Sequence, residues 1–390
     1  MANATPWTDR VAGALSVSAL GDAIGLPTEA RGLRGEIAVD ADPADPFELP
    51  VADTFRGETG DPWNIWAPAS RTAGMRGVVS DDTAVRVALI EPWLAETLGA
   101  GTPADALTEN DWLDWLTRRR VPDPEPWREA MVTQHAAQWP PMYALADGEN
   151  PGCSDGPCFY KPGEPACFGY FLFAELALLF ADRPLPDVFD RFSNFCRLDQ
   201  GPGPTITGVV AALIAQAARD ESQAEPLPRL WDRVLAELTQ AGRLDASLLH
   251  DVFLQPGQIG AHASGRSIEV FLQRVQREIY DHTTLAPNHD LKPFDPALQL
   301  AQISAYVGYA GDDPWLALKL AALGPGDTDT LAATLGLIVG ASLGHDAALR
   351  SEAGEALAAV EASTAALFDS PLPRRAAALV GSDRSEIQSL

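Results

Sequence analysis

Apolar residues recur along this chain at the three- and four-residue spacing of an α-helix, and show no sustained two-residue alternation of a strand. The first such stretch, residues 8–20, begins with the helix-capping residue Thr8 and places small or apolar side chains on one face. The other predicted helices cover residues 82–98, 105–119, 165–181, 187–197, 205–220, 226–241, 266–281, 296–307, 314–323, 329–343 and 346–367. Many of their apolar faces carry Ala, Gly and Ser, which lets helices approach closely. The pattern therefore predicts an all-α protein.

Two long stretches without this periodicity, residues 36–79 and 121–168, interrupt the helices. Both are rich in Pro and Gly, and loops of this length in a compact domain are usually either functional or disordered. Their aromatic content favours packed, functional loops. No repeat or composition shift marks a boundary, so we predict one compact multi-helix domain with long loops over residues 1–380 and a flexible tail over 381–390.

Composition and charge exclude several classes of protein. Of 390 residues, 46% are hydrophobic, which is enough for a sizeable core. The 54 acidic and 28 basic residues give a net charge of −26, which argues against binding long nucleic acids or anionic membrane surfaces. No signal peptide is visible, and the four Cys are too few for a disulfide scaffold. We expect a soluble cytoplasmic monomer, and the scarcity of Lys indicates a GC-rich bacterial coding sequence.

Three acidic clusters lie where predicted helices end or begin: Gly21 to Glu29, Ser80 to Thr83, and Asp327 to Thr330. Helix capping explains one hydroxyl or carboxylate at each start, but the second and third clusters hold more acceptors than capping needs. If the clusters converge, two carboxylates 4 Å apart repel by about 4 kcal/mol at an effective dielectric of 20, and a cation would offset that cost. Carboxylate and hydroxyl oxygens suit Mg²⁺ or Mn²⁺ rather than Zn²⁺. Capping and metal binding both fit this spacing.

The order of these motifs resembles the ADP-ribosylglycohydrolase family, which includes the dinitrogenase-reductase-activating glycohydrolases and the ADP-ribosyl-acceptor hydrolases. The residues that carry the resemblance are the glycine-rich stretch from Gly13 to Glu29, the run from Ser80 to Thr83, and the stretch from Gly326 to Gly344. It is strongest in the last motif and weak through the middle of the chain.

The resemblance implies a compact all-α domain with two Mg²⁺ ions, or Mn²⁺ in their place. Family members hydrolyse the N- or O-glycosidic bond at C1″ of the distal ribose in ADP-ribosyl adducts, so the expected partner is ADP-ribose or an ADP-ribosylated protein or small molecule. The implied metal ligands are Ser80, Asp81, Asp82 and Asp329 for one ion and Asp327, Asp329 and Thr330 for the other. The implied catalytic residues are Glu29, which matches the family's mobile glutamate, and Asp82.

The chain departs from the family pattern at several positions. Ser80 replaces the usual Thr but keeps the hydroxyl, and Pro325 stiffens the approach to Asp327. Residues 198–207 lack the His that many relatives have there, and residues 148–157 match the family's Gly-Asn-Gly loop only loosely. Metal chemistry thus looks retained and acceptor recognition altered. Two alternatives stay open: a non-catalytic, ADP-ribose-binding or crystallin-like relative, and a hydrolase of nucleotide-linked ADP-ribose.

Other features point to structure rather than chemistry. Cys153, Cys158 and Cys167 lack the spacing and the nearby His of a zinc site. His345 is expected to interact with a helix C-terminus. The aromatic residues of the long loops could stack on adenine, although packing is favoured; they are Trp63, Trp66, Phe159 and Tyr160.

Overall fold

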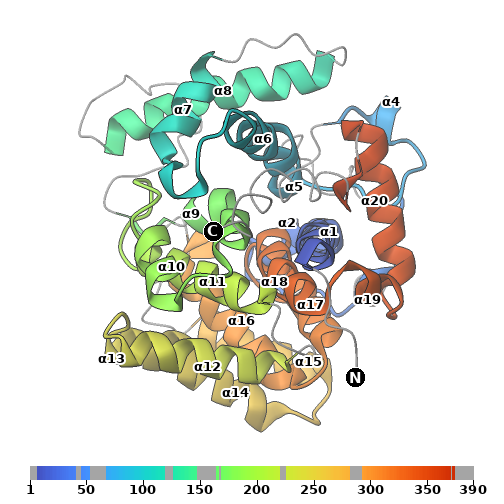
Figure 1. Cartoon of the computed structure of the whole chain (residues 1–390). Coiled ribbons are helices and arrows are strands. Elements are labelled where there is room, and N and C mark those ends of the chain that lie inside the picture. Colours follow the sequence, from blue (N-terminus) through green and yellow to red (C-terminus); the bar gives the residue numbers. More distant parts are fainter. Residues whose placement is uncertain are drawn as a thin grey trace, which may run out of the picture.

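The computed structural model describes residues 7–40, 45–52, 67–118, 126–146, 164–166, 168–219, 225–281, 292–369 and 371–373. Within these ranges the regular structure is helical, and β-pairing is limited to two isolated bridges, Val51 with Arg76 and Ala166 with Gln200. The all-α prediction is confirmed. Figure 1 shows α1, α17 and α18 at the centre, with α7 and α8 above them and α12 and α14 below.

The α-helices are α1 (Trp7–Gly25), α2 (Glu29–Gly32), α4 (Ala69–Thr72), α5 (Asp81–Val85), α6 (Glu91–Gly99), α7 (Glu109–Arg118), α8 (Pro126–Ala146), α9 (Phe168–Phe173), α10 (Leu185–Phe192), α11 (Gly203–Ala218), α12 (Leu227–Gln240), α13 (Ala246–Leu248), α14 (Gln255–Ala263), α15 (Ile268–Val275), α16 (Pro296–Ala310), α17 (Pro314–Leu323), α18 (Thr328–Leu343), α19 (His345–Leu349) and α20 (Gly354–Phe368). The 3₁₀-helices are η1 (Leu26–Thr28), η2 (Pro46–Glu48), η4 (Ala104–Ala106), η5 (Ala174–Phe180) and η8 (Lys292–Phe294). The π-helices are η3 (Arg86–Ile90), η6 (Leu249–Leu254) and η7 (Gln276–Tyr280).

The two longest α-helices outside the predicted ranges are α8 and α14. The stretch expected to be irregular at 121–168 contains α8, which begins at Pro126, because proline is tolerated in the first turn of a helix. Helix α14 contains two glycines, which disfavour a helix in the absence of tertiary contacts. One of them, Gly260, lies so close to α16 that a Cβ there would stand 2.0 Å from the carbonyl oxygen of Ala305. This glycine serves helix packing rather than a turn.

Helices α1 and α18 form the centre of the fold and run antiparallel. Gly13 near the start of α1 faces Gly340 near the end of α18, and Gly21 faces Ala332. A Cβ on Gly21 would stand 2.1 Å from the carbonyl oxygen of Ala332, so the backbones are in direct contact. The stretch Trp7–Gly32 is apolar and long enough to cross a membrane, but 94% of its apolar window is buried within the protein. The antiparallel packing brings the end of α1 to the start of α18.

Candidate metal centre

Three acidic clusters far apart in the sequence meet at this end of the α1–α18 pair. The chain leaving α1 brings Asp22 and Glu29, the start of α5 brings Ser80 to Asp82, and the start of α18 brings Asp327 to Thr330. All of these residues except Asp81 are buried. Thr330 Oγ1 donates to the Asp82 carboxylate at 3.2 Å, which joins the second cluster to the third. The convergence that the sequence could not show is therefore present.

The start of α5 is capped from another helix. Asp22 of α1 is fully buried, and its carboxylate accepts the backbone N–H of Ser80 at 2.8 Å and that of Thr83 at 2.9 Å. Ser80 Oγ in turn accepts the N–H of Asp82 at 3.2 Å. These bonds satisfy three N–H groups at the helix start without using the carboxylates of Asp81 and Asp82.

Capping also fails to explain the third cluster. Asp327 is the N-cap residue of α18, yet its side chain makes no capping hydrogen bond. One ligand oxygen from each of Asp327, Asp329 and Glu29 can be chosen so that all three lie within 4.8 Å of one another. Among the described residues, Glu29 Oε2 is buried and has no hydrogen-bond partner. A buried carboxylate with an unpaired oxygen, close to two other buried carboxylates, fits a hard cation.

Burial and mutual repulsion make these carboxyls hard to ionise. The pKa of Glu29 rises to about 11, because of burial first and the charge of Asp329 second. The same two causes, in the same order, raise the pKa of Asp82 and that of Asp327 well above the ordinary aspartate range. Burial, and then the charge of Asp329, raise the pKa of Asp22 to about 6, and hydrogen bonds from Thr83 and Ser80 limit the rise because they favour the charged form. A divalent cation would supply the missing positive charge and displace the protons.

The residues around Glu29 are bonded to the approach to α18. Thr28 Oγ1 lies within hydrogen-bond distance of the carbonyl oxygens of Gly25, at 2.9 Å, and Ala322, at 2.5 Å. Thr328 Oγ1 donates to the same Gly25 oxygen at 2.9 Å, and the N–H of Gly326 donates to the carbonyl of Gly32 at 2.8 Å. The backbone on both sides of Glu29 is therefore held by hydrogen bonds against the approach to α18.

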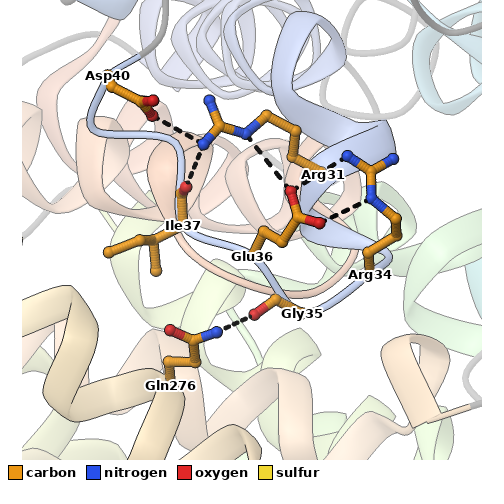
Figure 2. A network of polar contacts seen from close by, with 7 residues as sticks. All are labelled: Arg31, Arg34, Gly35, Glu36, Ile37, Asp40 and Gln276. Carbon is orange, nitrogen blue, oxygen red and sulfur yellow. Dashed lines mark hydrogen bonds and ion pairs between the residues drawn. The ribbon is translucent and has the colours of Figure 1, made fainter.

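Figure 2 shows the polar network that fixes the chain after α2. Its members are Arg31, Arg34, Gly35, Glu36, Ile37, Asp40 and Gln276. Arg31 Nη2 donates to the carbonyl oxygen of Ile37 at 2.9 Å and to Asp40 at 2.7 Å. Gln276 of η7 donates to the carbonyl oxygen of Gly35 at 2.5 Å. The segment that carries Glu29 is thus anchored to the helices beneath it.

Helix α16 supports the turn that precedes Asp327. Gln302 Nε2 donates to the carbonyl oxygen of Pro325 at 2.5 Å. A Cβ on Gly324 would stand 2.0 Å from the hydroxyl of Tyr306, and Gly326 has a φ of +103°, which favours glycine. The Gly-Pro-Gly sequence is therefore needed to bring Asp327 to the site.

Comparison with known proteins identifies the family of the chain. The profile of the ADP-ribosylglycohydrolase family matches residues 3–381, nearly the whole chain. The chain belongs to the ADP-ribosylglycohydrolase family. A solved structure described as an "ADP-ribosylglycohydrolase-related protein complex" is 18% identical, covers 96% of this chain and 98% of its own, and superimposes with a TM-score of 0.49. No curated protein matches the chain.

Membership of the ADP-ribosylglycohydrolase family makes this chain a glycohydrolase-type enzyme. The family is metal-dependent and acts on ADP-ribosylated substrates, and the buried acidic cluster is suited to a metal. The structure brings together the residues that the sequence motifs nominated, which are Glu29, Ser80, Asp81, Asp82, Asp327, Asp329 and Thr330. Sequence reasoning missed the capping role of Asp22, although its place in the Gly21-Asp22 motif was a signal.

The sequence also singled out residues outside the acidic cluster. Residues 198–207, where many relatives have a histidine, contain Asp199 instead. Its carboxylate accepts hydrogen bonds from Thr207 Oγ1 at 2.5 Å and from the N–H of Gly169 at 2.7 Å, so it is bonded within the fold. His345 directly follows Gly344, the C-cap of α18, in the first turn of α19, and its Nε2 bonds to Glu361 at 2.6 Å; an interaction with the C-terminus of α18 stays a prediction. Several predictions fall outside the described residues, namely those for residues 148–157, Trp63, Trp66, Phe159, Tyr160, Cys153, Cys158, Cys167 and the tail 381–390.

Proposed function

We propose that this chain binds two divalent cations, Mg²⁺ or Mn²⁺, and hydrolyses the N- or O-glycosidic bond at C1″ of ADP-ribosyl adducts to release ADP-ribose. The observation that carries the proposal is the buried group of Glu29, Asp327 and Asp329, with one Glu29 oxygen unpaired among the described residues. Family membership supplies the reaction class, and the donor set supplies the choice of a hard cation.

The residues that would hold the cations are the oxygens already gathered at the site. Ser80, Asp81, Asp82 and Asp329 would hold one ion, and Asp327, Asp329 and Thr330 the other, with Asp329 shared between them. When bound, two divalent cations can orient ribose hydroxyls and activate water for attack at an anomeric carbon.

The chain's own contribution is the arrangement of these oxygens before any ligand arrives. Asp22 holds the start of α5 through two backbone N–H groups, and the Gly324-Pro325-Gly326 turn holds Asp327. Glu29 retains a proton in the absence of cations because its pKa is raised far above neutral. The positive charge of bound cations would favour loss of that proton, so the ionisation of Glu29 would depend on metal.

A substrate panel tests the proposal. Proteins ADP-ribosylated on arginine or serine, and small ADP-ribosyl adducts, are incubated with the wild type in Mg²⁺, Mn²⁺ or EDTA, and free ADP-ribose is measured. We expect multiple turnovers with at least one substrate in Mg²⁺ or Mn²⁺, none in EDTA, and none with Asp329→Ala. Asp312→Ala, which changes an exposed acidic residue after α16, is the matched control and should keep full activity.

The outcomes separate the proposal from its alternatives. Turnover by Asp329→Ala at the wild-type rate, or turnover in EDTA, contradicts the metal mechanism. Binding of ADP-ribose without turnover of any substrate indicates the non-catalytic alternative. Turnover confined to short ADP-ribosylated oligonucleotides or nucleotides would move the substrate class to nucleic-acid adducts.

A further inference from the structure

A buried ion pair lines the pocket that opens beside Asp82 and Thr330, and the proposed chemistry makes no use of it. Arg86 Nε lies 3.5 Å from Glu175 Oε2, and the two side chains are only 8% and 2% exposed. Arg86 comes one helical turn after Asp82, where α5 passes into the π-helix η3. Short π-helical turns within α-helices are frequent at functional sites. The location therefore links this pair to the carboxylate cluster.

The Arg86 guanidinium connects the elements that carry the carboxylates. Its Nη1 donates to Ser18 Oγ of α1 at 2.7 Å, and its Nη2 donates to Thr83 Oγ1 of α5 at 3.3 Å. Ser18 Oγ donates onward to the carbonyl oxygen of Ala333, in the first turns of α18, at 2.9 Å. Thr83 is also one of the two residues whose N–H groups bond to Asp22. One side chain thus ties α1, α5, η5 and α18 together behind the site.

Stability alone does not account for this pair. Removing two ions from water costs several kcal/mol for each ion, and replacing a buried pair by apolar residues of similar volume is often neutral or stabilising. The pair also has no net charge, so it does not offset the repulsion within the carboxylate cluster. What the pair adds is a fixed geometry between the elements it joins, because the planar guanidinium group holds several N–H donors in one plane.

We propose that Arg86, oriented by Glu175, is a positioning residue that holds the starts of α5 and α18 at the spacing required to bind divalent cations. The inference rests on the proposed function, since it concerns the same site. Partners behind the ligands of a metal site typically contribute 10–100-fold to metal affinity. Loss of the pair should therefore weaken cation binding while the chain stays folded.

Titration calorimetry with Mg²⁺ alone, together with thermal unfolding, tests this role. The main variant is Arg86→Met/Glu175→Met, which removes both charges and leaves neither one buried alone. Arg86→Lys keeps the charge but loses the fork. The matched control is Arg128→Met, because Arg128 is also buried but bonds to Leu367 and Asp369 at the end of α20. We expect about 10–100-fold weaker Mg²⁺ binding in the double variant, weakened binding in Arg86→Lys, and wild-type affinity in Arg128→Met.

The outcomes distinguish this inference from the proposed function. A wild type that binds neither Mg²⁺ nor Mn²⁺ contradicts the proposed function itself. A wild type that binds, with a double variant of equal affinity, overturns the positioning role and leaves the function standing. If the double variant does not fold, Arg86→Lys decides, and wild-type affinity in that variant overturns the inference.

Discussion

Asp329→Asn should stabilise the metal-free protein while abolishing its response to metal. Asp329 is the charged neighbour with the largest effect on four other carboxyls, raising the pKa of Asp22, Glu29, Asp82 and Asp327. Asparagine keeps the oxygen that accepts the N–H of Thr330 at 3.0 Å, so the substitution removes charge with little change of shape.

The magnitude follows from the distances within the cluster. Oxygens of Asp329, Asp327 and Glu29 lie within 4.8 Å of one another, and two charges at that separation repel by about 3.5 kcal/mol at an effective dielectric of 20. Protonation relieves part of this cost at about 1.4 kcal/mol for each pKa unit. We therefore expect Asp329→Asn to gain about 1–3 kcal/mol in EDTA at pH 8. For a chain of 390 residues this raises Tm by about 1–4 °C.

Thermal unfolding with and without Mg²⁺ measures both halves of the prediction. At a Mg²⁺ concentration of about 100 times Kd for both sites, the wild type should gain about 2.7 kcal/mol for each of the two cations, about 5.4 kcal/mol in all, whereas Asp329→Asn should gain nothing. The order of stability then reverses between EDTA and Mg²⁺. Asp312→Asn, on an exposed turn, should match the wild type in both conditions. A variant that is less stable than the wild type in EDTA, or that gains as much from Mg²⁺, refutes the reasoning.

Three further predictions concern Glu29, Asp199 and the helix contact at Gly21. Because Glu29 already holds its proton in the metal-free protein, Glu29→Gln should leave the free energy of unfolding in EDTA at pH 8 unchanged. The same variant should bind Mg²⁺ at least about tenfold more weakly by calorimetry. Equal affinity would contradict the role of Glu29. Burial raises the pKa of Asp199 to about 7, so wild-type stability should fall by up to about 4 kcal/mol as pH rises from about 4 through about 7. Asp199→Asn should remove that part of the pH dependence of unfolding, and an unaltered pH profile would contradict it. Gly21→Ala forces α1 and α18 apart and should lower the free energy of unfolding, measured in denaturant, by about 1–3 kcal/mol. Gly99→Ala, where the added Cβ meets no atom within 4 Å, should be neutral or slightly stabilising. Equal effects of the two substitutions would argue against the close contact of α1 with α18.

The sequence predicted the helical fold because most helices carry a continuous apolar stripe. Helix α8 was missed because it carries prolines, and α14 because it carries a proline and two glycines, whose roles depend on tertiary contacts such as that of Gly260 with α16. Local sequence patterns do not show contacts between residues far apart in the chain.

The candidate site, like the fold, could be predicted only in part from the sequence. Local motifs were sufficient to nominate the acidic clusters, because excess carboxylates at helix starts are visible in the sequence. The bond from Asp22 to the start of α5 and the link from Arg86 to Ser18 depend on the packing of α5 and η3 against α1. These contacts join residues 58 and 68 positions apart, which no local spacing could indicate.

The most direct test of the central claim is the anomalous diffraction of Mn²⁺ in crystals of the wild type. The account predicts two Mn²⁺ peaks, one among Ser80, Asp81, Asp82 and Asp329 and the other among Asp327, Asp329 and Thr330, with both lost in Asp329→Ala. Crystals soaked at saturating Mn²⁺ that show no peak within bonding distance of Asp329 would contradict it.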